Sequence, residues 1–200
     1  MRLSWDDLPA AVRDAVAGRV GPVAAARDVG AGFNCQLATA LESGAGGGTV
    51  FAKGLCAPGG PELAGQDTEQ ALAPVVRTVG PRLRHRVRTG GWDVLLFDHI
   101  QGRHARLEPG SADLPAVAAL LTAAAVLDAP AGLPPYAERW ARHGSAAELA
   151  LLGGDALVHA DVNPHNLLVS GGSGGGRGWW TGRCPPAAPP GPMSRRQRCG

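Results

Sequence analysis

The residues best suited to chemistry are a histidine, an aspartate and an asparagine that lie close together in the second half of the chain. His159, Asp161 and Asn166 form the pattern H-x-D-x-x-x-x-N, and apolar residues 167–169 follow directly. At this spacing the carboxylate accepts a hydrogen bond from a substrate hydroxyl, and the asparagine oxygen helps to hold Mg²⁺. The pattern therefore predicts phosphoryl transfer, with Asp161 as the catalytic residue and Asn166 as a metal ligand. His159 is predicted to hold the loop backbone from the core.

Lys53 is the second candidate, because it is the single lysine among the 19 lysine and arginine residues. It ends the segment Thr49-Val-Phe-Ala-Lys53, a predicted strand, and a lysine in this context pairs the α- and β-phosphates of ATP. Glu69, on a predicted helix that follows, is the candidate partner of the Lys53 ammonium, with Glu62 as its rival. The alternatives are a solvent-facing lysine on an edge strand and an exposed helix carboxylate.

Two further segments could contact a nucleotide through their backbone. Gly30 and Gly32 lie in a predicted hairpin turn, where glycine lets the backbone approach phosphates closely, although a lone G-x-G is more often a plain turn. Asp98 and Ile100 end an apolar strand, at a place where backbone groups could bind adenine.

The elements that must position these residues are predicted from hydrophobic periodicity and from turn residues. A capping box at Ser4–Asp7 predicts a first helix, which ends near Gly18 and Gly21. We predict strands at 23–28, 33–41, 49–53, 92–100, 156–159 and 167–169, and helices at 67–76, 114–127 and 136–152.

The composition changes sharply after residue 170. Residues 171–200 contain nine glycines, five prolines and five arginines but no acidic residue, and we predict that they are disordered. The net charge of +2 therefore arises in this tail, and it gives little reason to expect a nucleic-acid partner. No signal peptide or membrane span is expected, and the four cysteines show no metal-ligand spacing. We expect reduced thiols in a cytoplasmic protein.

The order of the glycine hairpin, Lys53, Glu69, the segment 97–102 and the loop 159–166 resembles the aminoglycoside phosphotransferase family of small-molecule kinases. The resemblance covers about residues 20–170. It implies an α+β, bilobal protein-kinase-like fold, with a complete N-lobe at 1–100 and an incomplete C-lobe at 101–170. It also implies ATP and Mg²⁺ as cofactors and a small-molecule hydroxyl as acceptor.

The chain departs from that family in one respect, because no Asp or Glu follows Asp161. The family has a second metal-binding aspartate soon after the catalytic loop, and then helices that bind the acceptor. Trp179-Trp180-Thr181 is encoded by TGGTGGACN, and a shifted frame of that sequence contains GTG-GAC, which encodes Val-Asp. We therefore interpret the tail as a frameshifted reading of a kinase C-terminus.

Three hypotheses about function follow. The first is ATP-dependent phosphotransfer to a small-molecule hydroxyl, impaired in this chain by the missing carboxylate. The second is a catalytically inactive nucleotide-binding remnant or gene fragment. The third, nucleic-acid binding by the basic tail, has the weakest support.

Overall fold

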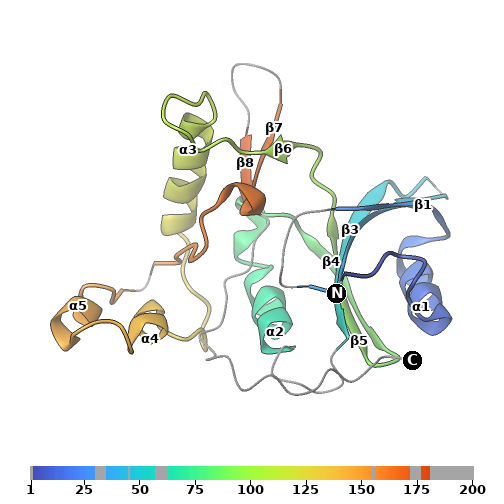
Figure 1. Cartoon of the computed structure of the whole chain (residues 1–200), viewed down its shortest axis with the longest axis horizontal. Helices are drawn as coiled ribbons and strands as arrows, with labels where there is room; N and C mark the ends of the chain where they lie inside the picture. Colours follow the sequence, from blue (N-terminus) through green and yellow to red (C-terminus); the bar gives the residue numbers. More distant parts are fainter. Residues whose placement is uncertain are drawn as a thin grey trace. The chain divides into compact units, whose positions relative to one another are not determined.

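The structure is a computed structural model that describes residues 2–29, 35–44, 46–56, 63–154 and 156–171, together with the backbone of 177–180 (Figure 1). The fold is α+β, as predicted. The chain divides into two compact units, the first within residues 1–66 and 81–101 and the second within 67–80 and from Gly102 onward. A sheet-bearing unit followed by a helix-bearing unit fits a kinase-like fold with a partial C-lobe. Residues 67–80, which the sequence analysis placed in the first lobe, belong to the second unit.

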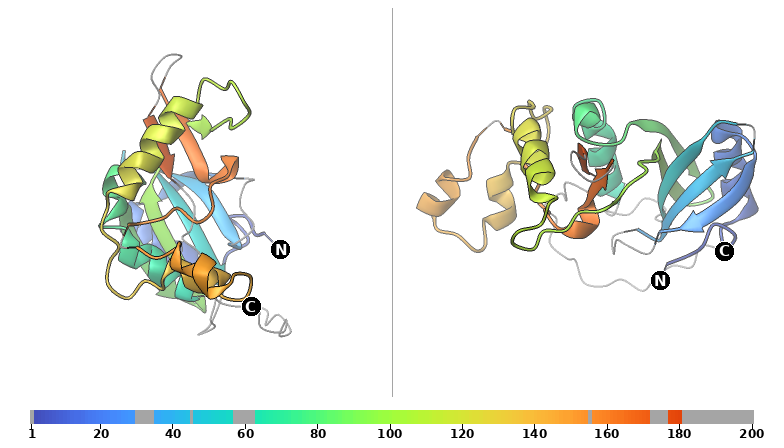
Figure 2. Two further views of the ribbon diagram at one scale, coloured as in Figure 1. Left: turned by 90° about the vertical axis from the view of Figure 1, so that its left-hand side faces the viewer. Right: turned by 90° about the horizontal axis from the view of Figure 1, so that it is seen from above.

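The first unit is built on a five-stranded antiparallel sheet. Its strand order is β1-β2-β3-β5-β4, so β3 lies at the centre and β4 at an edge. Helix α1 lies against one side of the strands (Figure 2). The elements are α1 (Ala10–Val20), β1 (Val23–Asp28), β2 (Leu37–Ser43), β3 (Thr49–Cys56), β4 (Leu83–Thr89) and β5 (Trp92–Asp98).

The apolar core of the first unit lies between α1 and the sheet. Val12 and Val16 of α1 are fully buried against Val50 of β3 and against Val94 and Leu96 of β5. Because successive strand side chains point to opposite faces, these residues take one face of the sheet and leave alternate positions for the other. The second face of β3 and β5 is therefore free to carry polar residues.

The first helix begins later than predicted. Ser4 does form the capping hydrogen bonds, since its N–H and its hydroxyl both donate to Asp7 Oδ2, at 2.9 and 2.7 Å. They close a turn, and α1 itself starts at Ala10, after Pro9. The helix ends at Val20, and its C-cap residue Gly21 has a φ of 88°, a conformation that glycine adopts without steric cost.

The helix predicted at 67–76 is shifted toward the N-terminus. Helix α2 spans Leu63–Leu72, and a short 3₁₀ turn, η1 (Val76–Thr78), follows it. Pro74 explains the early end, because proline cannot donate to the helix ladder and disfavours helical geometry in the residue before it.

The second unit combines a small three-stranded sheet with short helices. Its core is formed by buried apolar residues, among them Val117 and Leu120 of α3, and Leu167 and Val169 of β7. The sheet has the order β6-β7-β8. The elements are β6 (Arg103–His104), α3 (Leu114–Ala125), α4 (Tyr136–Trp140), α5 (Ala146–Ala150), a 3₁₀ turn η2 (Pro164–Asn166), β7 (Leu167–Ser170) and β8 (Arg177–Trp180).

Two predictions in this unit are wrong. The helix predicted at 136–152 is divided into α4 and α5, because Ser145 caps α5 in a capping box with Glu148 and so starts a new helix. The strand predicted at 156–159 is reduced to one isolated bridge between Asp128 and Ala156.

Part of the tail forms a strand. Arg177–Trp180 form β8, which pairs antiparallel with β7 through Leu167–Trp180 and Leu168–Trp179. The prediction of disorder is therefore wrong for these four residues, and residues 181–200 lie outside the described part of the chain. Cys56 is disulfide-bonded, so the expectation of reduced thiols is wrong for that residue. Among the described residues, no helix is long and apolar enough to cross a membrane.

Gly102 starts the second unit and passes very close to β7. A Cβ at this position would lie 2.8 Å from the carbonyl oxygen of Val169, closer than real Cβ atoms approach backbone. Glycine is therefore required here, and its presence lets the incoming chain pair with the strand that follows the loop 159–166.

Candidate functional site

The loop that contains Asp161 is organised around that carboxylate. Asn163 Nδ2 donates to Asp161 Oδ1 at 2.8 Å, and Asn166 Nδ2 donates to Asp161 Oδ2 at 2.7 Å. The Asn166 amide also donates to the backbone oxygen of Asp161, at 3.0 Å. The two amides fix the orientation of the carboxylate, and each carboxylate oxygen keeps a further lone pair for a substrate hydroxyl or a cation.

The same contacts fix the orientation of the Asn166 amide. Its nitrogen faces two oxygens of Asp161, so the reversed amide would bring oxygen against oxygen. Asn166 Oδ1 therefore points away from Asp161, and no hydrogen bond to it comes from the described residues. A hard, neutral oxygen in this position suits Mg²⁺.

Asn163 is a site residue that sequence reasoning missed. Besides contacting Asp161, its Oδ1 accepts a hydrogen bond from the N–H of His165, at 2.9 Å, and so caps the turn η2. An asparagine two residues before such an N–H, and immediately before a proline, is a signal for an Asx turn that could have been found in the sequence. Asn163 thus links the shape of the loop to the orientation of its carboxylate.

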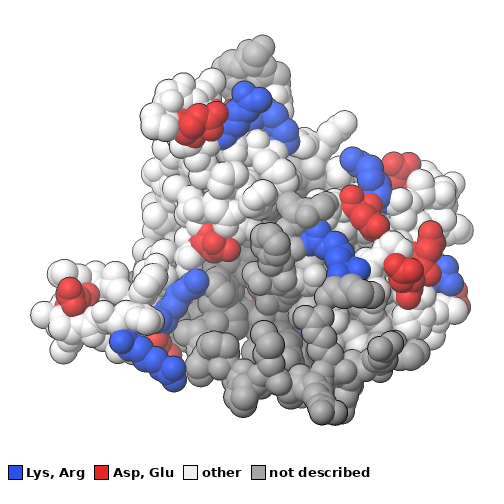
Figure 3. Space-filling model, viewed as in Figure 1, with Lys and Arg blue, Asp and Glu red and all other residues white. Residues whose placement is uncertain are grey.

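The loop is held from two sides. His104 of β6 donates from Nδ1 to the carbonyl oxygen of Pro164, at 3.1 Å. Arg103, its neighbour, makes a two-point ion pair with Asp113, with distances of 2.5 and 2.6 Å. The Arg103 guanidinium and the Arg106 N–H lower the pKa of Asp113 to about 2. These contacts connect the loop through β6 to the start of α3. Figure 3 shows the charged side chains of both signs that lie on one face of the described surface.

His159 supports the backbone of the loop from the interior, as predicted. It is buried, and its Nδ1 accepts a hydrogen bond from the N–H of Asp161 at 3.2 Å. An accepting Nδ1 places the proton of the neutral ring on Nε2. Burial lowers the pKa of His159 to about 4, against the opposing effects of its backbone hydrogen bond and of Asp161.

We expect the free energy of unfolding to fall as the pH drops from about 6.5 to about 4 because of His159. Its folded pKa is depressed, so the unfolded chain takes up the proton in this range while the folded chain does not. Through His159 alone, the free energy of unfolding should be about 2 kcal/mol lower at pH 5 than at pH 7. Urea unfolding at the two pH values, compared with His159→Gln, measures it. An equal pH dependence in the variant would contradict the assignment.

Lys53 lies on the central strand of the first unit. It pairs with Ala38 of β2 and with Leu95 of β5, and it is only 8% exposed. This placement on the third strand is the context that the lysine motif requires. It excludes the alternative of a solvent-facing lysine on an edge strand.

The other predicted nucleotide contacts have different outcomes. Glu69 is partly buried on α2, so it is not a fully exposed carboxylate. The N–H of Asp98 donates to the carbonyl of Arg82, at 2.8 Å, and the Asp98 side chain pairs with Arg82 and Arg84. That N–H is therefore already used, which leaves Ile100, in the loop after β5, as the stronger adenine candidate. Gly30 and Gly32 lie outside the described residues.

The described residues fit Mg²⁺ as a partial site. Asp161 and Asn166 offer oxygens, which are the ligands that Mg²⁺ takes, and this ion commonly uses one or two protein groups together with water and substrate phosphates. In the described ranges, no group of three or more His, Cys, Asp or Glu residues could hold a metal ion by itself.

Comparisons with known proteins add little to this geometry. No protein family model matches the chain, and no curated protein matches it. Among solved structures it is similar to the PknI kinase domain of Mycobacterium tuberculosis, with 19% identity and a TM-score of 0.38 over 81% of this chain. A mutant of that domain with one cysteine replaced by alanine gives 17% identity and a TM-score of 0.35 over 75%. The chain spans 60% and 57% of those two structures. TM-scores this low do not establish a shared fold.

Proposed function

We propose that the chain derives from an ATP-dependent phosphotransferase that acts on a hydroxyl of a small molecule. The observation that carries this proposal is the geometry of Asp161 and Asn166. The carboxylate is fixed by amide donors, while the Asn166 oxygen points away from Asp161, and we propose that it binds a cation there. Phosphoryl transfer depends mainly on positioning and on charge stabilisation, and this loop supplies both kinds of group. The acceptor class is implied by the family resemblance alone.

Each residue then has a defined role. Asp161 accepts the hydrogen bond of the acceptor hydroxyl and directs its oxygen toward the γ-phosphate, and Asn166 is one ligand of Mg²⁺. Lys53, buried on β3, contributes an ammonium for the nucleotide phosphates, and Glu69 orients that ammonium. Bound Mg²⁺ would neutralise charge on the β- and γ-phosphates. His159 keeps the Asp161 backbone in place.

A second candidate is a nucleotide-binding remnant without turnover. The absence of any Asp or Glu after Asp161 favours it. The end of β8 pairs with Leu167, the residue that follows Asn166. In the shifted frame Val-Asp takes the place of Trp180-Thr181, so the frameshift hypothesis would put a carboxylate next to the position that pairs with Leu167.

Titration with a fluorescent ATP analogue in the presence of Mg²⁺ tests the nucleotide-binding part of the proposal on the 200-residue chain. We expect saturable binding that Lys53→Met weakens at least about tenfold, since a charge-assisted contact is lost. Arg19→Met, which removes one exposed positive charge from α1, is the matched control and should have no effect. Binding that does not depend on Lys53 would overturn the proposal.

Asn163→Asp separates the two contacts of Asn163. The carboxylate can still accept from the His165 N–H, but it cannot donate to Asp161 and repels it. We make the change in a version of the gene with one base restored before codon 179, so that Val-Asp is encoded. There we expect ATP turnover to fall about tenfold. The loss of stability should be smaller than in Asn163→Ala, which removes both contacts. Turnover and urea unfolding of both variants measure this. A turnover equal to that of the unaltered protein would show that Asn163 only shapes the turn.

A further inference from the structure

Two exposed histidines lie side by side next to the loop 159–166. His104 belongs to β6 and His165 to η2, and both residues are part of the second unit. The centroids of their rings are 5.7 Å apart, and the ring planes are inclined at 74°. An edge-to-face contact of two imidazoles accounts for this spacing, but the same spacing also suits two ligands of one metal ion.

The distance between the rings is close to that of two imidazoles bound to one zinc ion. Zn²⁺ binds imidazole nitrogen at about 2.0–2.1 Å, which places each ring centroid about 3.2 Å from the metal. At the tetrahedral angle of a zinc site the two centroids are then about 5.2 Å apart, and at an angle of about 120° they are about 5.5 Å apart. The observed 5.7 Å is slightly larger than both values. Rotation of the two exposed side chains about their own bonds can therefore bring one nitrogen of each ring to a shared ion.

A hydrogen bond prepares His104 to act as a ligand. Its Nδ1 lies 3.1 Å from the carbonyl oxygen of Pro164, and since a carbonyl can only accept, Nδ1 carries the proton. In the neutral ring, Nε2 then keeps its lone pair. Histidines that bind metals commonly donate their other ring nitrogen to a backbone carbonyl in this way, which fixes the tautomer and the orientation of the ring. In the described part of the chain, His165 makes its hydrogen bond through the backbone N–H, so its ring nitrogens remain available.

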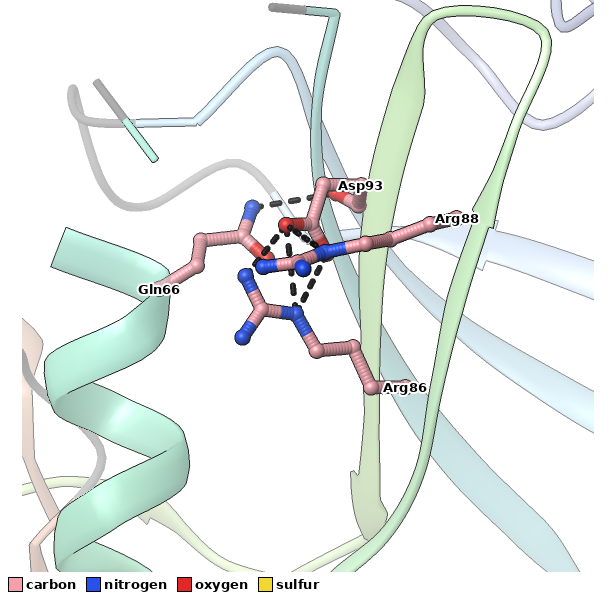
Figure 4. Close-up of polar contacts among 4 residues, drawn as sticks. All are labelled: Gln66, Arg86, Arg88 and Asp93. Atoms are coloured by element: carbon pink, nitrogen blue, oxygen red, sulfur yellow. Dashed lines mark hydrogen bonds and ion pairs between the residues drawn. The ribbon is translucent and has the colours of Figure 1, made fainter. Parts of the chain in front are cut away.

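A polar cluster on the sheet of the first unit shows the contrast. Arg86 and Arg88 both donate to the carboxylate of Asp93 through Nε, at 2.8 and 3.0 Å. Gln66 donates to the backbone oxygen of Asp93, at 3.0 Å (Figure 4). These groups bind one another and hold β4 on β5, whereas the histidine pair presents nitrogen lone pairs to the solvent.

The chemistry of the pair favours a transition metal over Mg²⁺. Imidazole nitrogen suits Zn²⁺, Cu²⁺ and Ni²⁺, whereas Mg²⁺ takes oxygen ligands. Because the described residues offer no group of three or more His, Cys, Asp or Glu side chains to a metal, two protein ligands are expected, with water completing the coordination. The positive charge of Arg103, the neighbour of His104, is balanced by an ion pair with Asp113, which reduces its repulsion of a cation. Such an ion exchanges with the solvent more readily than a zinc ion held by four protein ligands.

We propose that His104 and His165 form a binding site for a divalent transition-metal ion, Zn²⁺ foremost. The ion joins β6 to η2, the turn that contains Asn166, and so holds the loop 159–166 against β6. This site does not depend on the proposed function, because it requires neither a nucleotide nor an acceptor.

Calorimetric titration of the untagged 200-residue chain with Zn²⁺, in the presence of millimolar Mg²⁺, tests the proposal. We expect one Zn²⁺ per chain. His104→Asn keeps a donor near the place of Nδ1 but lacks Nε2. It should weaken binding at least about tenfold, as should His165→Asn, because loss of an outer-shell partner alone costs about 10–100-fold in metal affinity. The double variant should be less than about twofold weaker than either single variant, since both residues bind the same ion. His143→Asn makes the same change at an exposed histidine between α4 and α5, and it should leave the affinity unchanged.

Several results would overturn the proposal. Absence of Zn²⁺ binding is one, and unchanged affinity in both single variants is another, since it would place the ion at other groups such as cysteine thiols. Additive losses in the double variant would indicate two separate sites. If His104→Asn does not fold, as judged by circular dichroism, His165→Asn decides alone. As a second readout, paramagnetic Cu²⁺ should broaden the ring signals of His104 and His165 in NMR spectra before that of His143, and equal broadening of all three would contradict the site.

Discussion

A version of the gene with one base restored before codon 179 is expected to turn over ATP at least about 10²-fold faster than the 200-residue chain. The reason is the metal site. The chain offers Mg²⁺ the oxygen of Asn166 but no acidic residue after it, and the restored frame encodes Val-Asp where β8 ends beside the Asn166 end of β7. Loss of one preorganised electrostatic group costs about 10²–10³ in rate, and loss of a metal anchor should cost at least as much.

The measurement is ATP consumption by both versions, in the presence of a panel of aminoglycosides, amino alcohols and sugars. A restored version in which the new aspartate is changed to asparagine is the matched control, since it keeps the downstream sequence and removes only the carboxylate. Equal turnover by the 200-residue chain would contradict the frameshift hypothesis. A restored protein that binds no ATP would contradict the proposed function as well.

The conformation of the loop 159–166 could be predicted from sequence because its main hydrogen bonds are local. Asp161, Asn163 and Asn166 contact one another within five positions, so their types and spacing determine the turn almost without help from the rest of the fold. The central strand with Lys53 was predictable for a similar reason, since its apolar neighbours are typical of a buried strand. Asn163 was missed although its Asx signal was present.

Strand β4 could not be predicted, because the residues that stabilise it lie elsewhere in the sequence. Arginines occupy alternate positions 82–88, which indicates an exposed polar segment when it is considered alone. In the fold, these side chains pair with Asp93 and Asp98 of the neighbouring strand β5. The pairing is a tertiary contact, and tertiary contacts override local preference in strands.

The helices at 136–152 and 67–76 were predicted with wrong bounds because two local signals compete in each segment. Hydrophobic periodicity continues through 136–152, whereas the capping box at Ser145 and Glu148 starts a new helix within it. For α2, the periodic pattern extends past Pro74, but the proline ends the helix at Leu72. In each case one residue overrides the periodic pattern: Ser145 by capping a new helix, and Pro74 by lacking the N–H that the helix would need.

Asp161→Asn is expected to reduce ATP turnover of the frame-restored protein by about 10²–10⁴, the range for a positioned general base. The asparagine side chain is nearly identical in shape, but its amide is a much weaker acceptor for the proton of an attacking hydroxyl. One of its two terminal atoms would also be a donor, which must face the amide of Asn163 or that of Asn166, where Asp161 now accepts from both. The effect should therefore appear in kcat, together with a modest loss of stability.

Nucleotide affinity distinguishes this prediction from general damage to the site. Lys53 is untouched, so the affinity for the fluorescent ATP analogue should stay within about twofold of the unaltered protein, while turnover is nearly lost. Asp14→Asn, the same change at an exposed position on α1, is the control and should alter neither quantity. If Asp161→Asn retains most of the turnover, the carboxylate held by Asn163 and Asn166 is not the group that activates the acceptor. If it abolishes nucleotide binding instead, Asp161 serves mainly to bind the metal–nucleotide complex, and the division of roles between Asp161 and Asn166 proposed here is wrong.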